Sequence, residues 1–94
     1  MEMYNPPHPG EILLEGWIKP LGYSISEFAL KLGTSRKNLS EIVNGKTGIS
    51  PEMALKIEKA LKSRAGFWLD MQQEYDLWQA RQRVNLDNVE VIAM

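Results

Sequence analysis

The chain has 94 residues and a net charge of −1, with 44% hydrophobic and 24% charged residues, which is the composition of one small globular domain. It has no cysteine and no apolar stretch as long as a membrane span, so disulfides, thiolate metal sites and a transmembrane segment are excluded. The N-terminus also lacks the apolar core of a secretory signal, so we expect a soluble cytoplasmic protein.

The first predicted helix runs from Pro9 to about Ile18. Proline is favoured in the first turn of a helix because its missing N–H needs no partner there, and Pro20 ends the helix. The apolar side of this helix consists of Ile12, Leu13 and Trp17. The single histidine, His8, lies just before it with no cysteine or second histidine for a metal site, so we expect a structural role for its ring.

A helix-turn-helix pattern occupies about residues 24–44. Its first helix has apolar residues at i, i+3, i+4 and i+7, which places them on one face. These residues are Ile25, Phe28, Ala29 and Leu32. Ser24 and Glu27 have the spacing of a capping box at the start of the helix. Gly33 supplies the positive φ that ends it and lets the chain reverse.

The second helix of the motif separates into an apolar and a polar face. Its inward residues are Leu39, Ile42 and Val43, and its outward residues are Arg36, Lys37, Asn38, Ser40, Glu41 and Asn44. Side chains that donate and accept hydrogen bonds can read base edges when such a helix lies in the major groove of DNA. The motif therefore predicts DNA binding.

Two more helices complete the predicted fold. One is capped by Ser50 and begins at Pro51, and its inner stripe is Met53, Ala54, Ile57, Ala60 and Leu61. The last runs from about Ala65 to Gln82 with Phe67, Trp68, Met71, Tyr75 and Trp78 on one face. A helical domain this small has little room for so many large side chains, so two uses of this stripe stay open, as core and as homodimer interface. The residues predicted for the dimer interface are Trp68, Tyr75 and Trp78.

The sequence thus predicts an all-α domain of five helices over residues 1–83, followed by a C-terminal tail at 84–94. The tail changes period, because Val89 and Val91 alternate with Glu90 as in a strand. Two alternatives stay open for it: a strand that pairs across a dimer or with a partner's sheet edge, and a frayed end.

Charge is unevenly distributed along the chain. Residues 31–64 carry eight cations and three carboxylates, a net charge of +5, whereas the rest of the chain carries three cations and nine carboxylates, a net charge of −6. The local field within a Debye length of about 10 Å governs the approach of a polyanion. One face can therefore meet DNA while acidic surface elsewhere remains for a cationic partner. The alternative is a helix face that is merely solvated.

The motifs as a whole resemble those of one family of bacterial regulators. They are NPPHPGEIL at 5–13, KPLG at 19–22, SRKNLSEIVNGKTGISPEMALKIEKAL at 35–61 and FWLDMQQEYDLWQA at 67–80. The helix-turn-helix resembles the Cro and repressor family of phages, and the longer match is to HigA-type antitoxins of toxin–antitoxin operons. The resemblance implies a Cro/repressor-like fold. It also implies a homodimer that represses its own operon and neutralises a HigB-type toxin, which cleaves mRNA on the ribosome.

The resemblance to the phage repressors assigns roles along the second motif helix. The positions that read bases fall on Arg36, Lys37 and Glu41, and Ser35, Asn44 and Lys46 fall where phosphate contacts are common. The predicted DNA-binding residues are then Ser35, Arg36, Lys37, Asn38, Ser40, Glu41, Asn44 and Lys46. A phosphate-binding glutamine of the phage family is replaced here by Ile25, which puts that contact in doubt. Glu41 is also spaced to form an ordinary surface pair with Lys37.

No catalytic chemistry is predicted. Gly45 and Gly48 flank Lys46 without the spacing of a phosphate-binding loop. Asp70 and Glu74 lie one turn apart on a solvated face. We therefore expect no enzyme, no cofactor, no metal and no small-molecule or membrane partner; the expected partners are operator DNA, a toxin and a second copy of the chain. The alternative function is a stand-alone repressor without a toxin.

Overall fold

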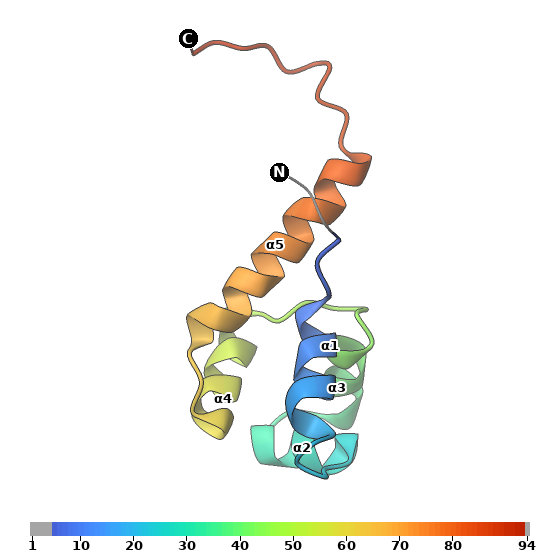
Figure 1. Cartoon of the computed structure of the whole chain (residues 1–94), viewed down its shortest axis with the longest axis vertical. Helices are drawn as coiled ribbons and strands as arrows, with labels where there is room; N and C mark the ends of the chain where they lie inside the picture. Colours follow the sequence, from blue (N-terminus) through green and yellow to red (C-terminus); the bar gives the residue numbers. More distant parts are fainter. Residues whose placement is uncertain (1–4, 94) are drawn as a thin grey trace.

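The computed structural model describes residues 5–93 as five helices in chain order, with no strand in that range (Figure 1). The first helix consists of an α-helical part, α1 (Pro9–Leu13), and a π-helical part, η1 (Leu14–Ile18). The others are α2 (Ile25–Leu32), α3 (Arg36–Val43), α4 (Pro51–Leu61) and α5 (Ala65–Arg83). The predicted all-α, five-helix fold is confirmed. Residues 1–4 and 94, the extreme ends of the predicted domain and tail, lie outside the described residues.

The first helix differs from the prediction in its second half. The sequence predicts an α-helix to about Ile18, but Lys19 N–H donates to the Leu14 carbonyl five residues back, at 3.0 Å, as in a π-helix. Leu13 and Ile18 are both fully buried. Residues five apart share a face in a π-helix and diverge in an α-helix, so the wider turn brings both side chains into the core.

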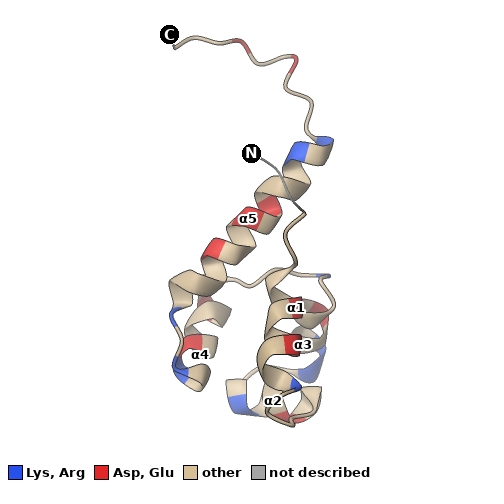
Figure 2. Ribbon diagram, in the orientation of Figure 1, with Lys and Arg blue, Asp and Glu red and all other residues tan. Residues whose placement is uncertain are grey.

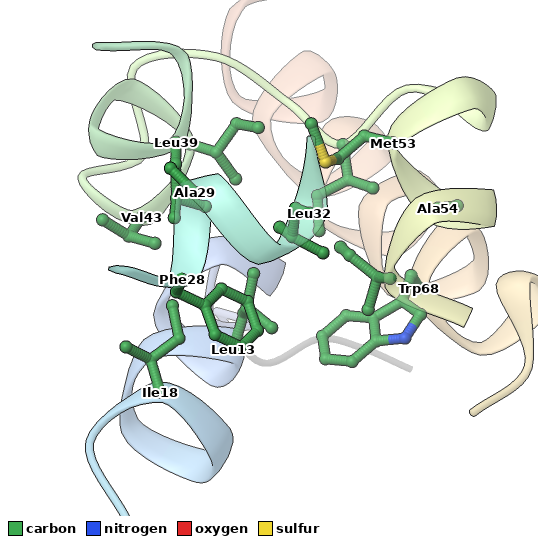
Figure 3. Close-up of a cluster of buried hydrophobic side chains, with 13 residues drawn as sticks. Leu13, Ile18, Phe28, Ala29, Leu32, Leu39, Val43, Met53, Ala54 and Trp68 are labelled. Carbon is green, nitrogen blue, oxygen red and sulfur yellow. The ribbon is translucent and has the colours of Figure 1, made fainter. Parts of the chain in front are cut away.

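The core lies where α1, α2, α3 and α4 converge on the start of α5. Figure 3 shows Phe28 of α2 against Leu13, with Ile18 beside it, and Trp68 of α5 near Leu32. The buried hydrophobic residues are Leu13, Ile18, Phe28, Ala29, Leu32, Leu39, Ile42, Val43, Ile49, Met53, Ala54, Ile57 and Trp68. The predicted inward faces of α2 and α3 therefore supply most of their side chains to one cluster.

The inner stripe predicted for α4 is correct except at one position. Ser50 caps the helix by accepting from Met53 N–H at 3.1 Å, and Pro51 is its first residue, as predicted. Ala60, however, is exposed. It lies in the last turn, where Leu61 packs against the core and Ala60 lines an open hollow between α2 and α4.

Helix α5 gives the molecule its elongated shape, with principal extents of 51 × 23 × 21 Å. Its first turns pack on α4, and its C-terminal half projects beyond the other helices (Figure 1). Residues 84–93 continue outward as an exposed segment with one turn, in which Val89 N–H donates to the Leu86 carbonyl at 3.0 Å. Within the described chain the tail is therefore irregular. None of the described helices is long and apolar enough to cross a membrane.

Candidate nucleic-acid interface

The start of α2 is fixed by the predicted capping box. Glu27 N–H donates to Ser24 Oγ at 3.1 Å, and Ser24 N–H donates to Glu27 Oε1 at 2.8 Å. The hydrogen bonds from Ser24 lower the pKa of the Glu27 carboxyl. Ile25, at the first position of α2, packs against the core, so the site that holds a phosphate-binding glutamine in the phage repressors is apolar here.

The turn between α2 and α3 has the backbone that the sequence predicts. Gly33 adopts φ 73°, ψ 36°, and Thr34 N–H donates back to the Ala29 carbonyl at 3.0 Å. Lys56 of α4 donates to the Gly33 carbonyl at 3.2 Å, which ties the turn to the next helix. The two motif helices are therefore held at a defined angle before any ligand binds.

Helix α3 is capped by Ser35, whose Oγ accepts from Asn38 N–H at 3.0 Å. Its inward residues Leu39, Ile42 and Val43 are buried, so the opposite face is turned to solvent. Arg36 and Lys37 are exposed in the first turn of α3, and Asn44 and Lys46 are exposed just after its last turn.

Not all polar residues of α3 are equally available to a ligand. The Asn38 amide is half-buried and donates to Thr34 Oγ1 at 2.8 Å, and the Asn44 amide donates to Ser40 Oγ at 3.3 Å. Lys37 and Glu41 are 4.0 Å apart. An exposed pair at that distance is worth less than about 1 kcal/mol and leaves Lys37 free to reorient.

The α3–α4 loop, residues 44–50, carries the last two predicted contacts. Lys46 N–H donates to the Glu41 carbonyl at 2.8 Å, and Gly45 adopts φ 75°. At its far end, Ile49 N–H donates to Oε1 of Gln72 on α5, at 2.7 Å. Gln72 was not among the predicted site residues. The sequence Met71-Gln72-Gln73 places two amides side by side and gives no sign of which one is buried.

His8 has the structural role that was expected of it. Its Nδ1 accepts from Gly10 N–H at 2.9 Å and so caps α1, and its ring meets Tyr75 edge-on with centroids 4.8 Å apart. Burial lowers the pKa of His8, while Asp76 and a hydrogen bond to the Thr47 backbone oppose that shift. The ring therefore joins α1, α5 and the α3–α4 loop in its neutral form.

The three aromatic residues predicted at a dimer interface occupy two different environments. Trp68 is fully buried, and its Nε1 donates to Ser63 Oγ at 3.0 Å, so it belongs to the core of this chain and presents no surface to a second copy. Tyr75 and Trp78 are half-buried on the projecting part of α5. The dimer hypothesis therefore rests on Tyr75 and Trp78.

Positive charge predominates from α2 to α4, where six lysines and arginines accompany four glutamates, whereas the middle of α5 is acidic and its C-terminal end is basic (Figure 2). The basic residues of α2, α3, α4 and the α3–α4 loop are Lys31, Arg36, Lys37, Lys46, Lys56 and Lys59, whereas the middle of α5 carries Asp70, Glu74 and Asp76. The chain therefore presents a predominantly cationic region around α3 and an acidic region in the middle of α5.

The helix-turn-helix family profile matches residues 16–68. The chain belongs to this family. It is 53% identical over 77 residues to virulence-associated protein A of Dichelobacter nodosus, which covers 81% of this chain and 76% of the relative. It is 33% identical over 79 residues to antitoxin HigA-1 of Vibrio cholerae, covering 84% and 74%.

Solved structures extend the likeness to nearly the whole chain. The structure of antitoxin GraA in complex with its operator matches with a TM-score of 0.89 and 31% identity, covering 100% of this chain and 98% of GraA. The resemblance to HigA-type antitoxins is therefore confirmed. The chain is an antitoxin-like DNA-binding helix-turn-helix protein of a non-enzymatic family.

Proposed function

We propose that this protein is the antitoxin of a toxin–antitoxin module. In this proposal a homodimer in the cytoplasm binds a palindromic operator, represses its own operon, and neutralises a toxin that cleaves mRNA on the ribosome. The observation that carries the proposal is the exposed polar face of α3 on a scaffold that matches operator-bound GraA along its whole length.

The DNA-binding part of the proposal assigns a role to each predicted residue. Arg36 and Lys37 are exposed at the start of α3, where their side chains reach guanine O6 and N7 in a major groove. Glu41, one turn along the same face, accepts from cytosine N4. Asn38 and Ser40 line the same face. Phosphate contacts come from Ser35 at the amino end of α3, and from Asn44 and Lys46 at its carboxyl end.

The toxin-binding part is supported by the antitoxins among the relatives and by the distribution of charge. The acidic residues of α1, η1 and α5 that face solvent are Glu11, Glu15, Asp70, Glu74 and Asp76. The three on α5 lie outside the cationic helix-turn-helix, so a basic protein can bind them without competing for DNA. Glu11 and Glu15 line a hollow together with Asn44 and Gly45, next to the proposed DNA contacts.

A reconstituted translation assay tests the neutralising activity. The toxin encoded beside this gene is added to ribosomes and an mRNA, and mRNA cleavage is followed with and without a molar equivalent of this protein. Our proposal predicts protection of the mRNA. Cleavage that continues with both proteins folded and mixed, together with intact operator binding, would identify the protein as a stand-alone repressor.

A further inference from the structure

The α3–α4 loop has no regular secondary structure, yet it carries two of the predicted phosphate contacts, Asn44 and Lys46. A cation contributes most to binding when its backbone is held at the distance of the phosphate, because less side-chain freedom is then lost. Lys46 N–H and Thr47 N–H both donate to the Glu41 carbonyl of α3, at 2.8 and 3.3 Å, so α3 holds the start of the loop. The course of the loop beyond Thr47 depends on its contacts with the rest of the chain.

One of these contacts is a buried side chain of α5. Gln72 is 9% exposed; its Oε1 accepts from Ile49 N–H at 2.7 Å and its Nε2 donates to Asp76 Oδ1 at 2.9 Å. Because the two ends of the amide have different partners, only one orientation satisfies both. Asp76 therefore sets the orientation in which Gln72 meets the loop.

The loop backbone also touches the Gln72 amide directly. A Cβ added to Gly48 would lie 2.8 Å from Nε2 and 2.9 Å from Cδ of Gln72. Gly48 does not have a positive φ, so its backbone conformation does not require glycine. The close approach of the Gln72 amide does, because it leaves no room for a Cβ. Any side chain at residue 48 must push Gln72 and the loop apart.

The other end of the loop rests on His8. The His8 ring lies beside Gly45, where an added Cβ would be 3.8 Å from the ring, and the Thr47 backbone raises the pKa of His8. His8 in turn contacts Tyr75. The two ends of the loop therefore contact the same stretch of α5, one directly through Gln72 and the other through His8 and Tyr75.

We propose that Gln72 is a positioning residue for DNA binding, which rests on the proposed function. Held by Asp76, it fixes the Ile49 amide and with it the place at which Lys46 meets the operator phosphates.

The test uses the variant Gln72→Glu, which keeps an acceptor for Ile49 N–H but places a second carboxylate against Asp76. Repulsion between the carboxylates displaces the loop. We expect operator affinity of the full chain to fall about tenfold, the equivalent of one charge-assisted hydrogen bond. The slope of log affinity against log salt should become shallower by about one.

Two further variants separate positioning from charge and from stability. Gln73→Glu adds the same charge to an exposed neighbour on α5, and it should leave affinity within about twofold of the wild type. Gln72→Glu combined with Asp76→Asn reverses the polarity of the pair and restores the net charge. This double variant should recover wild-type affinity, salt slope and the ¹⁵N-correlated resonance of the Ile49 amide.

Three results would overturn the proposal. The first is a Gln72→Glu variant that keeps the affinity and slope of Gln73→Glu although its Ile49 resonance has moved. If Gln72→Glu does not fold, Gly48→Ala makes the same test from the loop side. Unchanged operator binding by Gly48→Ala is the second result that would overturn the proposal. A wild-type chain that prefers no operator refutes the proposed function itself, and positioning with it.

Discussion

Among single residues, the outer side chains of α3 differ in whether they already have a hydrogen-bond partner within the protein. The amides of Asn38 and Asn44 are bonded to Thr34 and Ser40. The Arg36 side chain forms no hydrogen bond or ion pair within the described residues. It can therefore meet a base without first losing an interaction, and we assign most of the sequence preference to it and its neighbour Lys37.

Replacing both cations tests this assignment. Arg36→Ala with Lys37→Ala should abolish selective operator binding, because each lost bidentate contact to guanine costs about 1–3 kcal/mol. The thermal unfolding midpoint should hardly change, since both side chains are exposed. Fluorescence anisotropy with labelled operator and circular dichroism measure the two effects.

The matched control for that double variant is Lys19→Ala with Arg81→Ala. It removes one lysine and one arginine at exposed sites on η1's C-terminal side and on α5. Operator selectivity should survive in the control. Equal binding by both double variants would show that α3 is not the reading helix.

His8 links stability to pH. Burial lowers its pKa below the ordinary value of 6.5, so the unfolded chain binds a proton at a higher pH than the folded chain does. This part of the stability is complete above pH 6.5 and is lost as the pH falls from 6.5 toward the folded pKa. Urea unfolding between pH 7.5 and 5 should show the loss in the wild type and a smaller one in His8→Asn, which keeps a capping oxygen. Identical pH profiles would contradict this role.

At the scale of elements, the first helix is packed unusually closely on α3. A Cβ on Gly10 would lie 1.9 Å from the Ile42 carbonyl oxygen, whereas a Cβ on Gly16 meets nothing within 4 Å. Gly10→Ala must therefore move α1 away from α3, and Gly16→Ala only replaces a flexible residue in a helical segment.

These two substitutions should change the free energy of unfolding in opposite directions. We expect Gly10→Ala to lower it by about 1–3 kcal/mol through overpacking. Gly16→Ala should raise it by about 0.5–1 kcal/mol through helix propensity and the entropy of the unfolded chain. Chemical denaturation measures both. Two substitutions with the same sign would be inconsistent with the α1–α3 contact.

The elements that local chemistry determines are the ones that the sequence predicted. Ser24 and Glu27, Gly33 and Ser50 each act within a few residues of themselves, so their spacing suffices. The π-helical turn at 14–18 could not be predicted in this way, because it depends on the core that receives Ile18. Gln72 escaped prediction for the same reason, since its partner Ile49 is 23 residues distant.

The same distinction between local spacing and distant contacts applies to the site residues. Their position on the outer face of α3 followed from periodicity, but their individual roles came from the family resemblance and stay predictions. Trp68 and Tyr75 lie on one periodic face of α5, yet only Trp68 is fully buried. Periodicity identifies a face, whereas the extent of the core along that face depends on where the other helices end.

Considered as a whole molecule, the protein places its cationic helix-turn-helix at one end and projects α5 and the tail from the other (Figures 1 and 2). Helix-turn-helix dimers read half-sites about 34 Å apart, one turn of DNA. A second copy packed along α5 would cover Tyr75 and Trp78 and leave both α3 helices uncovered. The oligomeric state therefore decides how much of an operator one molecule can read.

Substitution of Trp78 tests the dimer. Trp78→Ala should raise the dimer dissociation constant by at least about tenfold, because a buried aromatic anchor is worth 2 kcal/mol or more at an interface. Leu30→Ala, which truncates an 82% exposed residue on α2, is the control and should leave it unchanged. Sedimentation equilibrium measures both variants, and a wild-type chain that stays monomeric at high concentration would refute the dimer.

The most direct test of the central claim, that α3 reads a specific operator, is a binding titration across a salt series. The full chain is titrated against DNA from immediately upstream of its own gene and against a scrambled sequence of equal length, with Lys46→Ala in parallel. We predict operator-selective binding whose log affinity falls linearly with log salt, with a slope about one unit shallower for Lys46→Ala. Equal affinity for both DNAs at every salt concentration would contradict the claim.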